Sequence, residues 1–251
     1  MNIIQSFYDN LASQYDKLFE DWQASMEEQA LVLERIFRAQ GFAKSASLLD
    51  CACGIGTQAI GLAALGYSVT ASDISSAELA EAAKRAADRE LRIRFHEADF
   101  RRLRETFAEK FDIIIAMDNA LPHMLTAEDL AAAVRSISSQ LNEGGIFVGS
   151  IRDYDALLET KPPYSPPYIH KTASGQRVSF QTWDWVGENY TLTQYIIEDG
   201  DTLQVSKFPC EYRAVRREEL TALFTGCACK VEWQTPEASG YYQPIIVCRK
   251  V

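Results

Sequence analysis

Residues 48–56 have the sequence LLDCACGIG, and this stretch decides the fold prediction. An apolar pair followed by Asp50 predicts a short buried strand that ends at a turn. Gly54 and Gly56 predict a sharp turn into a helix, because the missing side chains let backbone amides approach a ligand closely. The stretch therefore predicts a strand, a glycine turn and a helix that can hold a nucleotide-like group.

Strands and helices alternate on both sides of this turn. We expect strands at 48–52, 67–72, 91–96, 111–117 and 145–150, helices at 57–65, 76–88 and 126–141, and two closing strands near 230–234 and 244–249. Such alternation is typical of a parallel sheet, which the last two strands would close antiparallel at one edge. The predicted fold class is α/β, a doubly wound Rossmann-like seven-stranded sheet.

The remaining segments predict additions to a single domain that spans 1–251. Residues 1–40 lack an early glycine or proline and predict a helical cap. The proline-rich segment 161–168 predicts a loop, and polar alternation after it predicts three antiparallel strands. We therefore expect 160–210 to form an antiparallel insertion or lid.

Composition narrows the class of partner. The chain has 251 residues, 47% of them hydrophobic, and a formal net charge of −10. Because no run of Lys and Arg could neutralise several phosphates, nucleic acid and anionic membranes are poor partners, and a small-molecule substrate fits better. We find no leader and no membrane-length apolar run, so we expect a cytoplasmic protein. The six cysteines lack metal-ligand spacing, so no metal is expected; the oligomeric state is not predicted.

Acidic residues end the next two strands of the predicted sheet. Asp73 stands 17 positions after Gly56, where its carboxylate can accept both hydroxyls of a ribose. Asp99 ends the third strand, where it can accept the exocyclic amine of adenine, and Phe100 can supply an apolar wall. Because the carboxyl ends of parallel strands share one edge, these side chains predict one site for an adenosine group.

The glycine turn alone also fits a nicotinamide dinucleotide, so a nicotinamide-dependent oxidoreductase is the alternative enzyme. Two features oppose it. Asp50 lies four residues before the first glycine, and the strand end at 98–100 does not belong to that fingerprint.

The chain resembles the class I S-adenosylmethionine-dependent methyltransferases in the motif at 49–56, in Asp73 and in the strand end at 98–100. The resemblance covers about residues 45–150. The family usually has glycine where Ala52 stands. The segment 8–16 is similar to one that folds over the cofactor in small-molecule methyltransferases. The resemblance implies S-adenosyl-L-methionine as cofactor and contacts to it from Tyr15, Trp22, Asp50, Ala52, Cys53, Gly54, Gly56, Asp73, Ile74, Asp99, Phe100 and Met117.

On the acceptor side the chain is similar to the glycine N-methyltransferases. Asn119 and His123 match their Asn-x-x-x-His motif, and residues 152–155 are similar to their Arg-Asn-Tyr-Asp. The resemblance implies catalytic roles for His123, Asn119 and Arg152, with the arginine gripping an amino-acid carboxylate. From the residues themselves, His123 could accept a proton or only position the nucleophile, and Arg152 could instead pair with a neighbouring acid.

One departure limits the prediction of the acceptor. Glycine N-methyltransferases carry an arginine near the N-terminus that holds the cofactor carboxylate, whereas residues 18–34 here contain no Arg or Lys. We therefore expect methyl transfer to a small-molecule acceptor, favouring an amine nitrogen, without naming glycine. A non-catalytic S-adenosylmethionine-binding protein stays open as a second alternative.

Overall fold

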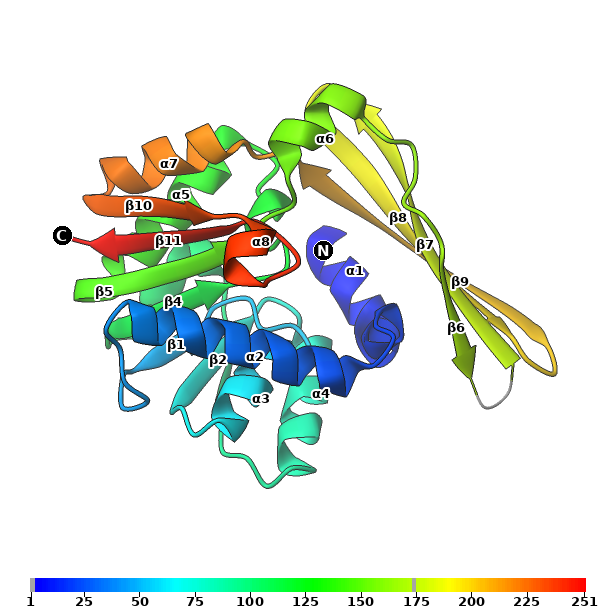
Figure 1. Cartoon of the computed structure of the whole chain (residues 1–251), viewed down its shortest axis with the longest axis horizontal. Coiled ribbons are helices and arrows are strands. Elements are labelled where there is room, and N and C mark those ends of the chain that lie inside the picture. Colours follow the sequence, from blue (N-terminus) through cyan, green and yellow to red (C-terminus); the bar gives the residue numbers. More distant parts are fainter. Residues whose placement is uncertain (1–2, 173–174) are drawn as a thin grey trace.

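The structure, a computed structural model, describes residues 3–172 and 175–251. A seven-stranded sheet lies between layers of helices, and a separate antiparallel sheet stands beside it (Figure 1). The strands of the larger sheet are β1 (Leu48–Asp50), β2 (Val69–Asp73), β3 (Arg94–Glu97), β4 (Phe111–Ala116), β5 (Leu141–Ser150), β10 (Cys229–Gln234) and β11 (Ile245–Lys250). Their order is β10-β11-β5-β4-β1-β2-β3, and β11 runs antiparallel to both neighbours. The predicted seven-stranded, doubly wound sheet is confirmed.

The helices fall at or near the predicted places, with several short additions. They are α1 (Ile3–Leu11), η1 (Ala12–Leu18), α2 (Trp22–Ala39), α3 (Thr57–Ala64), α4 (Ser76–Ala87), η2 (Phe100–Glu105), η3 (Leu121–His123), α5 (Ala127–Ser139), α6 (Tyr154–Thr160), α7 (Arg217–Gly226) and α8 (Pro236–Ser239). Among residues 3–172 and 175–251, no helix is long and apolar enough to cross a membrane.

Alternate residues of β4 pack into cores on opposite faces of the sheet. Ile113 and Ile115 belong to the core formed with α2 and α3, whereas Ile114 belongs to the core formed with α5 and α7. Helices on both faces explain why this parallel strand is an almost unbroken apolar run.

The strand order reverses between β1 and β4. These two strands are hydrogen-bonded neighbours, although β2 and β3 lie between them in the chain and on the other side of β1. In open α/β sheets, ligands bind beyond the carboxyl ends of the strands at such a point. The glycine turn follows β1 at this point, and Asp118 follows β4.

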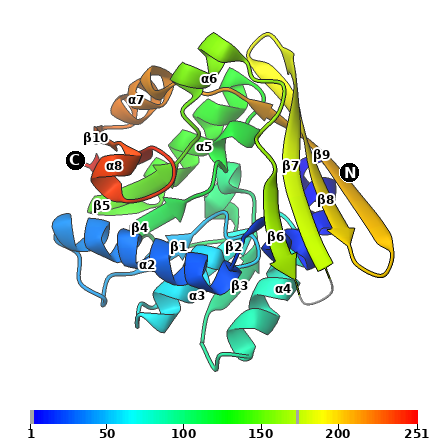
Figure 2. The same cartoon turned by 45° about the vertical axis from the view of Figure 1, so that its right-hand side comes forward.

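The N-terminal segment lies between the two sheets, as both views show (Figures 1 and 2). The Ser75 hydroxyl donates to the Asp9 carboxylate at 2.6 Å, which joins α1 to the start of α4. Lys17 pairs with Glu198 of the smaller sheet at 2.6 Å. The segment thus covers the carboxyl ends of the central strands. The first two residues of the predicted 1–40 cap lie outside the described residues.

The smaller sheet corrects the strand prediction. It has four strands in the order β6-β7-β8-β9: β6 (Tyr168–Thr172), β7 (Gly175–Val186), β8 (Asn189–Asp199) and β9 (Leu203–Arg213). We predicted three, because the proline-rich segment up to Tyr168 was assigned to a loop and the first alternating pattern begins at Arg177. The additional strand, β6, is mostly exposed. Backbone pairing of this edge strand with β7 forms it instead.

Candidate active site

The glycine turn has a backbone that favours glycine. Gly54 and Gly56 have φ angles of 51° and 90°, in the left-handed region. The amide of Gly54 donates to the Asp73 carboxylate at 2.9 Å, so the turn after β1 is tied to the end of β2. A Cβ atom at Gly54 would stand 2.9 Å from Oε2 of Glu78. The turn therefore brings bare backbone against two acidic side chains.

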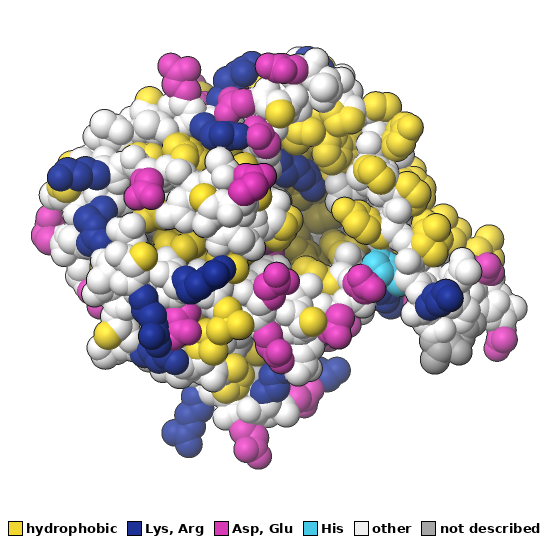
Figure 3. All heavy atoms as spheres, in the orientation of Figure 1, with side chains coloured by type: hydrophobic (Ala, Val, Ile, Leu, Met, Phe, Trp, Pro, Cys, Tyr) yellow, Lys and Arg dark blue, Asp and Glu magenta, His cyan; other side chains and the backbone are white. Residues whose placement is uncertain are grey.

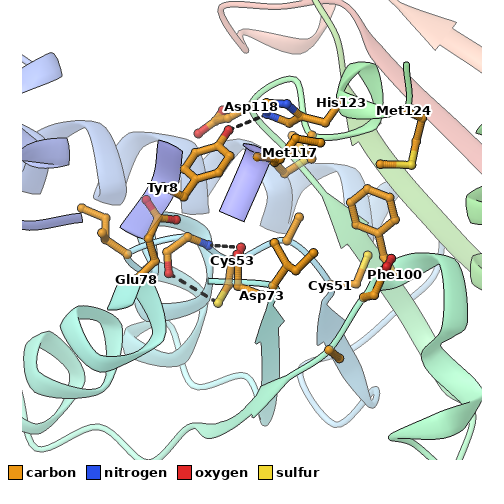
Figure 4. A pocket seen from close by; sticks show the side chains of 18 of the residues that line it. Tyr8, Cys51, Cys53, Asp73, Glu78, Phe100, Met117, Asp118, His123 and Met124 are labelled. Atoms are coloured by element: carbon orange, nitrogen blue, oxygen red, sulfur yellow. Dashed lines mark hydrogen bonds between the residues drawn. The ribbon is translucent and has the colours of Figure 1, made fainter. Parts of the chain in front are cut away.

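A first cavity of about 250 Å³ opens at this turn. Figure 4 shows Asp73 and Cys53 on its floor, Phe100 on one side, and Tyr8 of α1 over it. The predicted cofactor and catalytic residues that line it are Tyr15, Ala52, Cys53, Gly54, Asp73, Ile74, Asp99, Phe100, Met117 and His123. The cavity joins the ends of β1, β2, β3 and β4, as expected for parallel strands whose carboxyl ends share one edge of a sheet.

Five predicted residues do not line the first cavity: Trp22, Asp50, Gly56, Asn119 and Arg152. Trp22 is buried, and its indole N–H donates at 2.9 Å to the hydroxyl of Thr57, a lining residue. Asp50 is fully buried beneath the turn, and burial raises its pKa well above the usual range. These two side chains support the cavity wall from behind.

Three acids gather at one end of the first cavity. Asp73 and Glu78 line it, and Asp9 lies near both. Burial raises the pKa of Asp73, and it raises that of Glu78 further, with added repulsion from Asp73 and Asp9. Among the described residues, Oε1 of Glu78 has no hydrogen-bond partner. Glu78 was missed because Ser75-x-x-Glu78 is typical of a capping box, which explains such a residue without a ligand.

Asp99 is already engaged by its neighbour. Arg101 donates to both carboxylate oxygens, at 2.6 to 3.0 Å. Burial acts to raise the pKa of Asp99, but these hydrogen bonds lower it overall. Contact between Asp99 and an adenine amine stays a prediction. The adenine amine would have to share the Asp99 carboxylate with Arg101.

A second cavity of about 640 Å³ lies between the N-terminal segment, the smaller sheet and the segment 236–243, which includes α8. Figure 3 shows hydrophobic side chains gathered along the hollow between the two sheets. Arg152 lines this cavity and donates to the Tyr190 hydroxyl at 2.7 Å and to the Gln181 side chain at 3.2 Å. Its guanidinium carbon lies 5.1 Å from the ring centre of Trp183 and 5.5 Å from that of Tyr212.

The acids beside Arg152 in the sequence do not neutralise it. Asp153 and Asp155 instead pair with Arg217, at 2.6 and 3.4 Å. Within the described part of the chain, no carboxylate pairs with Arg152. Arg152 is thus a cationic group on the wall of the second cavity that forms no ion pair with a described residue.

Asn119 lies behind that wall. Its side-chain oxygen accepts from the amide of Arg152 at 3.1 Å and from the Tyr154 hydroxyl at 3.0 Å. It is buried and lines neither cavity. In this arrangement Asn119 fixes the chain that carries Arg152.

Comparisons with known proteins agree with this geometry. Residues 48–145 match the family model of a methyltransferase domain. The chain is 28% identical over 213 residues to glycine/sarcosine N-methyltransferase of Parasynechococcus marenigrum, covering 85% of this chain and 73% of that protein. A dTDP-3-amino-3,4,6-trideoxy-α-D-glucopyranose N,N-dimethyltransferase of Streptomyces venezuelae is 32% identical over 105 residues, 42% of each chain.

Solved structures show the same fold. A crystal structure of an S-adenosylmethionine-dependent methyltransferase from Clostridium acetobutylicum gives a TM-score of 0.77 at 19% identity, covering 97% of this chain and 98% of that one. The CcbJ methyltransferase of Streptomyces caelestis gives 0.79 at 17% identity over the whole of both chains.

The chain is a class I S-adenosylmethionine-dependent methyltransferase. Its cofactor is S-adenosyl-L-methionine, and the first cavity fits that molecule. At Gly54 the φ angle of 51° disfavours a side chain, and a Cβ there would press on the Glu78 carboxylate. Glu78 keeps an unpartnered buried oxygen, and Phe100 offers an apolar wall. We call the first cavity the cofactor cavity and the second the acceptor cavity.

In this methyltransferase the two cavities meet at shared residues. Tyr8, Tyr15 and Asp118 line both. Neither Tyr8 nor Asp118 was predicted individually as a site residue, although Tyr8 belongs to the segment 8–16 and Asp118 directly precedes Asn119. We call these three residues the junction.

His123 lies beside the junction in a buried setting. The hydroxyl of Tyr8 lies 2.6 Å from its Nε2, and Sγ of Cys210 lies 3.8 Å from its Nδ1. Burial lowers the pKa of His123 to about 3. The imidazole is therefore neutral at physiological pH and holds the Tyr8 hydroxyl in place.

This pKa predicts how stability depends on pH. Because folding lowers the pKa of His123, the unfolded chain binds the extra proton first, and stability falls as pH drops below about 6.5 towards 3. Relative to His123→Gln, the wild type should lose about 2 kcal/mol of unfolding free energy between pH 7.5 and 5. Urea unfolding at both pH values measures this, and parallel losses in the two proteins would show that His123 titrates normally.

Proposed function

We propose that this enzyme methylates the amine nitrogen of a small acceptor that also carries an anionic group. The observation that carries the proposal is the unneutralised guanidinium of Arg152 on the wall of the acceptor cavity. Planar guanidinium groups bind carboxylates or phosphates through two parallel hydrogen bonds. The relatives that act on glycine, sarcosine or an amino sugar support an amine as the nucleophile.

The size of the acceptor cavity supports a molecule larger than glycine. Its volume of about 640 Å³ is in the range of pockets that enclose drug-sized ligands, roughly 300 to 1,000 Å³. Strands of the smaller sheet supply Gln181, Trp183 and Tyr212 to its wall. We therefore propose that the insertion shapes the acceptor site.

Methyl transfer depends more on close contact between the acceptor nitrogen and the methyl group than on a strong acid or base in the protein. When bound, the cofactor supplies a methyl group activated by a cationic sulfur. The protein's own residues must hold the acceptor nitrogen in line with that methyl group and exclude water. Tyr8 and Tyr15 form part of the junction where the two cavities meet, and neutral His123 fixes Tyr8. With a pKa of about 3, His123 is a weak proton acceptor, so we assign it a positioning role.

A substrate panel tests this proposal. We expect release of S-adenosylhomocysteine with amines that bear a carboxylate or phosphate, and much less with the same amines lacking the anionic group. The panel should include glycine, sarcosine, longer amino acids, simple alkylamines and phenols. Turnover of phenols but not amines would overturn the choice of nitrogen. Cofactor binding without turnover of any member would favour a non-catalytic binding protein.

A further inference from the structure

Asp118 is an acid at the junction with no counter-ion of its own. Its carboxylate accepts from the side chains of Gln58 at 2.8 Å and Tyr242 at 2.8 Å, and from the hydroxyl of Tyr241. All three donors are neutral. Among the described residues, no Lys, Arg or His forms an ion pair with Asp118. The neutral donors hold the carboxylate in place but leave its negative charge uncompensated.

The backbone fixes Asp118 at the mouth of both cavities. Asp118 and Asn119 have φ angles of 54° and 71°, so the chain turns sharply after β4. The Asp118 amide donates to the hydroxyl of Ser150 at 2.8 Å. Non-glycine residues with positive φ are uncommon, although Asp and Asn tolerate it best. Two in succession hold the carboxylate where the cavities share a wall.

Charge moves across this junction during the reaction. The acceptor nitrogen forms a bond to the methyl carbon while the carbon–sulfur bond breaks and its electron pair stays on sulfur. Positive charge therefore leaves sulfur and develops on nitrogen, which later gives up a proton to solvent. A fixed negative charge beside the path stabilises the developing ammonium. An oxyanion nucleophile would instead be repelled by it.

We propose that Asp118 is the residue that selects amine acceptors over oxyanions, by stabilising the positive charge that develops on nitrogen at the junction. The inference rests on the proposed amine acceptor and deepens it. Asp118 and Arg152 are charges of opposite sign that both line the acceptor cavity. Together they fit an acceptor that attacks through a neutral amine nitrogen, gains positive charge there as the new bond forms, and carries an anionic group elsewhere.

The cofactor analogue sinefungin tests this role without a known acceptor. Its primary amine, protonated at neutral pH, replaces the sulfonium methyl group and would lie at the junction. By calorimetry at pH 7.5, the wild type should bind sinefungin at least tenfold more tightly than S-adenosylhomocysteine. Asp118→Asn should reduce that ratio about tenfold, because the variant loses the charge that attracts the ammonium of sinefungin. Glu27→Gln is the matched control, because it removes one exposed acid outside both cavities, and it should keep the wild-type ratio.

The outcomes separate this inference from the proposed function. A wild-type ratio near one, or an unchanged ratio in Asp118→Asn, overturns the role of Asp118. If Asp118→Asn fails to fold, the wild-type ratio still decides. If neither sinefungin nor S-adenosylhomocysteine binds, the assignment of the first cavity to the cofactor is wrong. A high wild-type ratio that falls in Asp118→Asn supports stabilisation of positive charge by Asp118. If the amine panel fails beside that result, the proposed amine acceptor is contradicted and the charge stabilisation is not.

Discussion

Replacing Arg152 by alanine is expected to lower kcat/KM for an anionic amine by about a hundredfold or more. Arg152 is the one cationic side chain among the described residues lining the acceptor cavity, and it is desolvated by aromatic neighbours. Truncating one member of a buried charge pair costs roughly 2 to 5 kcal/mol, and each 1.4 kcal/mol is tenfold. Steady-state rates of S-adenosylhomocysteine release measure the loss.

Two comparisons make the Arg152 result specific. S-adenosylhomocysteine affinity should be unchanged, because Arg152 does not line the cofactor cavity. Arg152→Lys should recover only part of the rate, since an ammonium cannot form two parallel hydrogen bonds. Equal loss for amines with and without the anionic group would mean that Arg152 supports the fold around Tyr190 and does not bind substrate.

Asp73→Ala should weaken cofactor binding by about 1 to 3 kcal/mol, which is roughly five- to 150-fold. The substitution removes the carboxylate expected to bind the ribose. It also leaves the amides of Gly54 and Ser75 without their acceptor. We therefore expect a lower melting temperature in addition to weaker binding, because unpaired buried donors destabilise the folded state.

Calorimetry with S-adenosylhomocysteine measures the Asp73 effect. Asp88→Asn is a suitable control, because Asp88 is an exposed carboxylate at the far end of α4 and lines neither cavity. It should bind like the wild type. Full affinity in Asp73→Ala would show that the carboxylate only organises the glycine turn.

The sequence was sufficient to predict the central sheet and the floor of the cofactor cavity. Both depend on local patterns: apolar runs such as 111–116, the glycines after β1, and the acid that ends β2. Parallel topology then requires the strand ends to share one edge. Asp73 and Asp99 meet in the cofactor cavity for that reason.

The acceptor side was less predictable because distant segments build it. Tyr8 meets His123 across 115 residues, and Tyr241 meets Asp118 across 123. Hydrophobic periodicity in the sequence does not predict contacts between residues so far apart in the chain. Arg152 and Asn119 were identified only through resemblance, and the structure adds that Asn119 lies behind the acceptor wall. Strand β6 escaped prediction because backbone pairing, not an apolar face, creates it.

A crystal structure with S-adenosylhomocysteine and an acceptor amine would test the account most directly. We predict that the ribose hydroxyls contact Asp73 and that the cofactor sulfur points to the junction. We also predict that the acceptor nitrogen faces the sulfur from the acceptor cavity, which Arg152 lines. A cofactor bound with its sulfur away from that junction, or an acceptor bound outside the second cavity, would contradict the account.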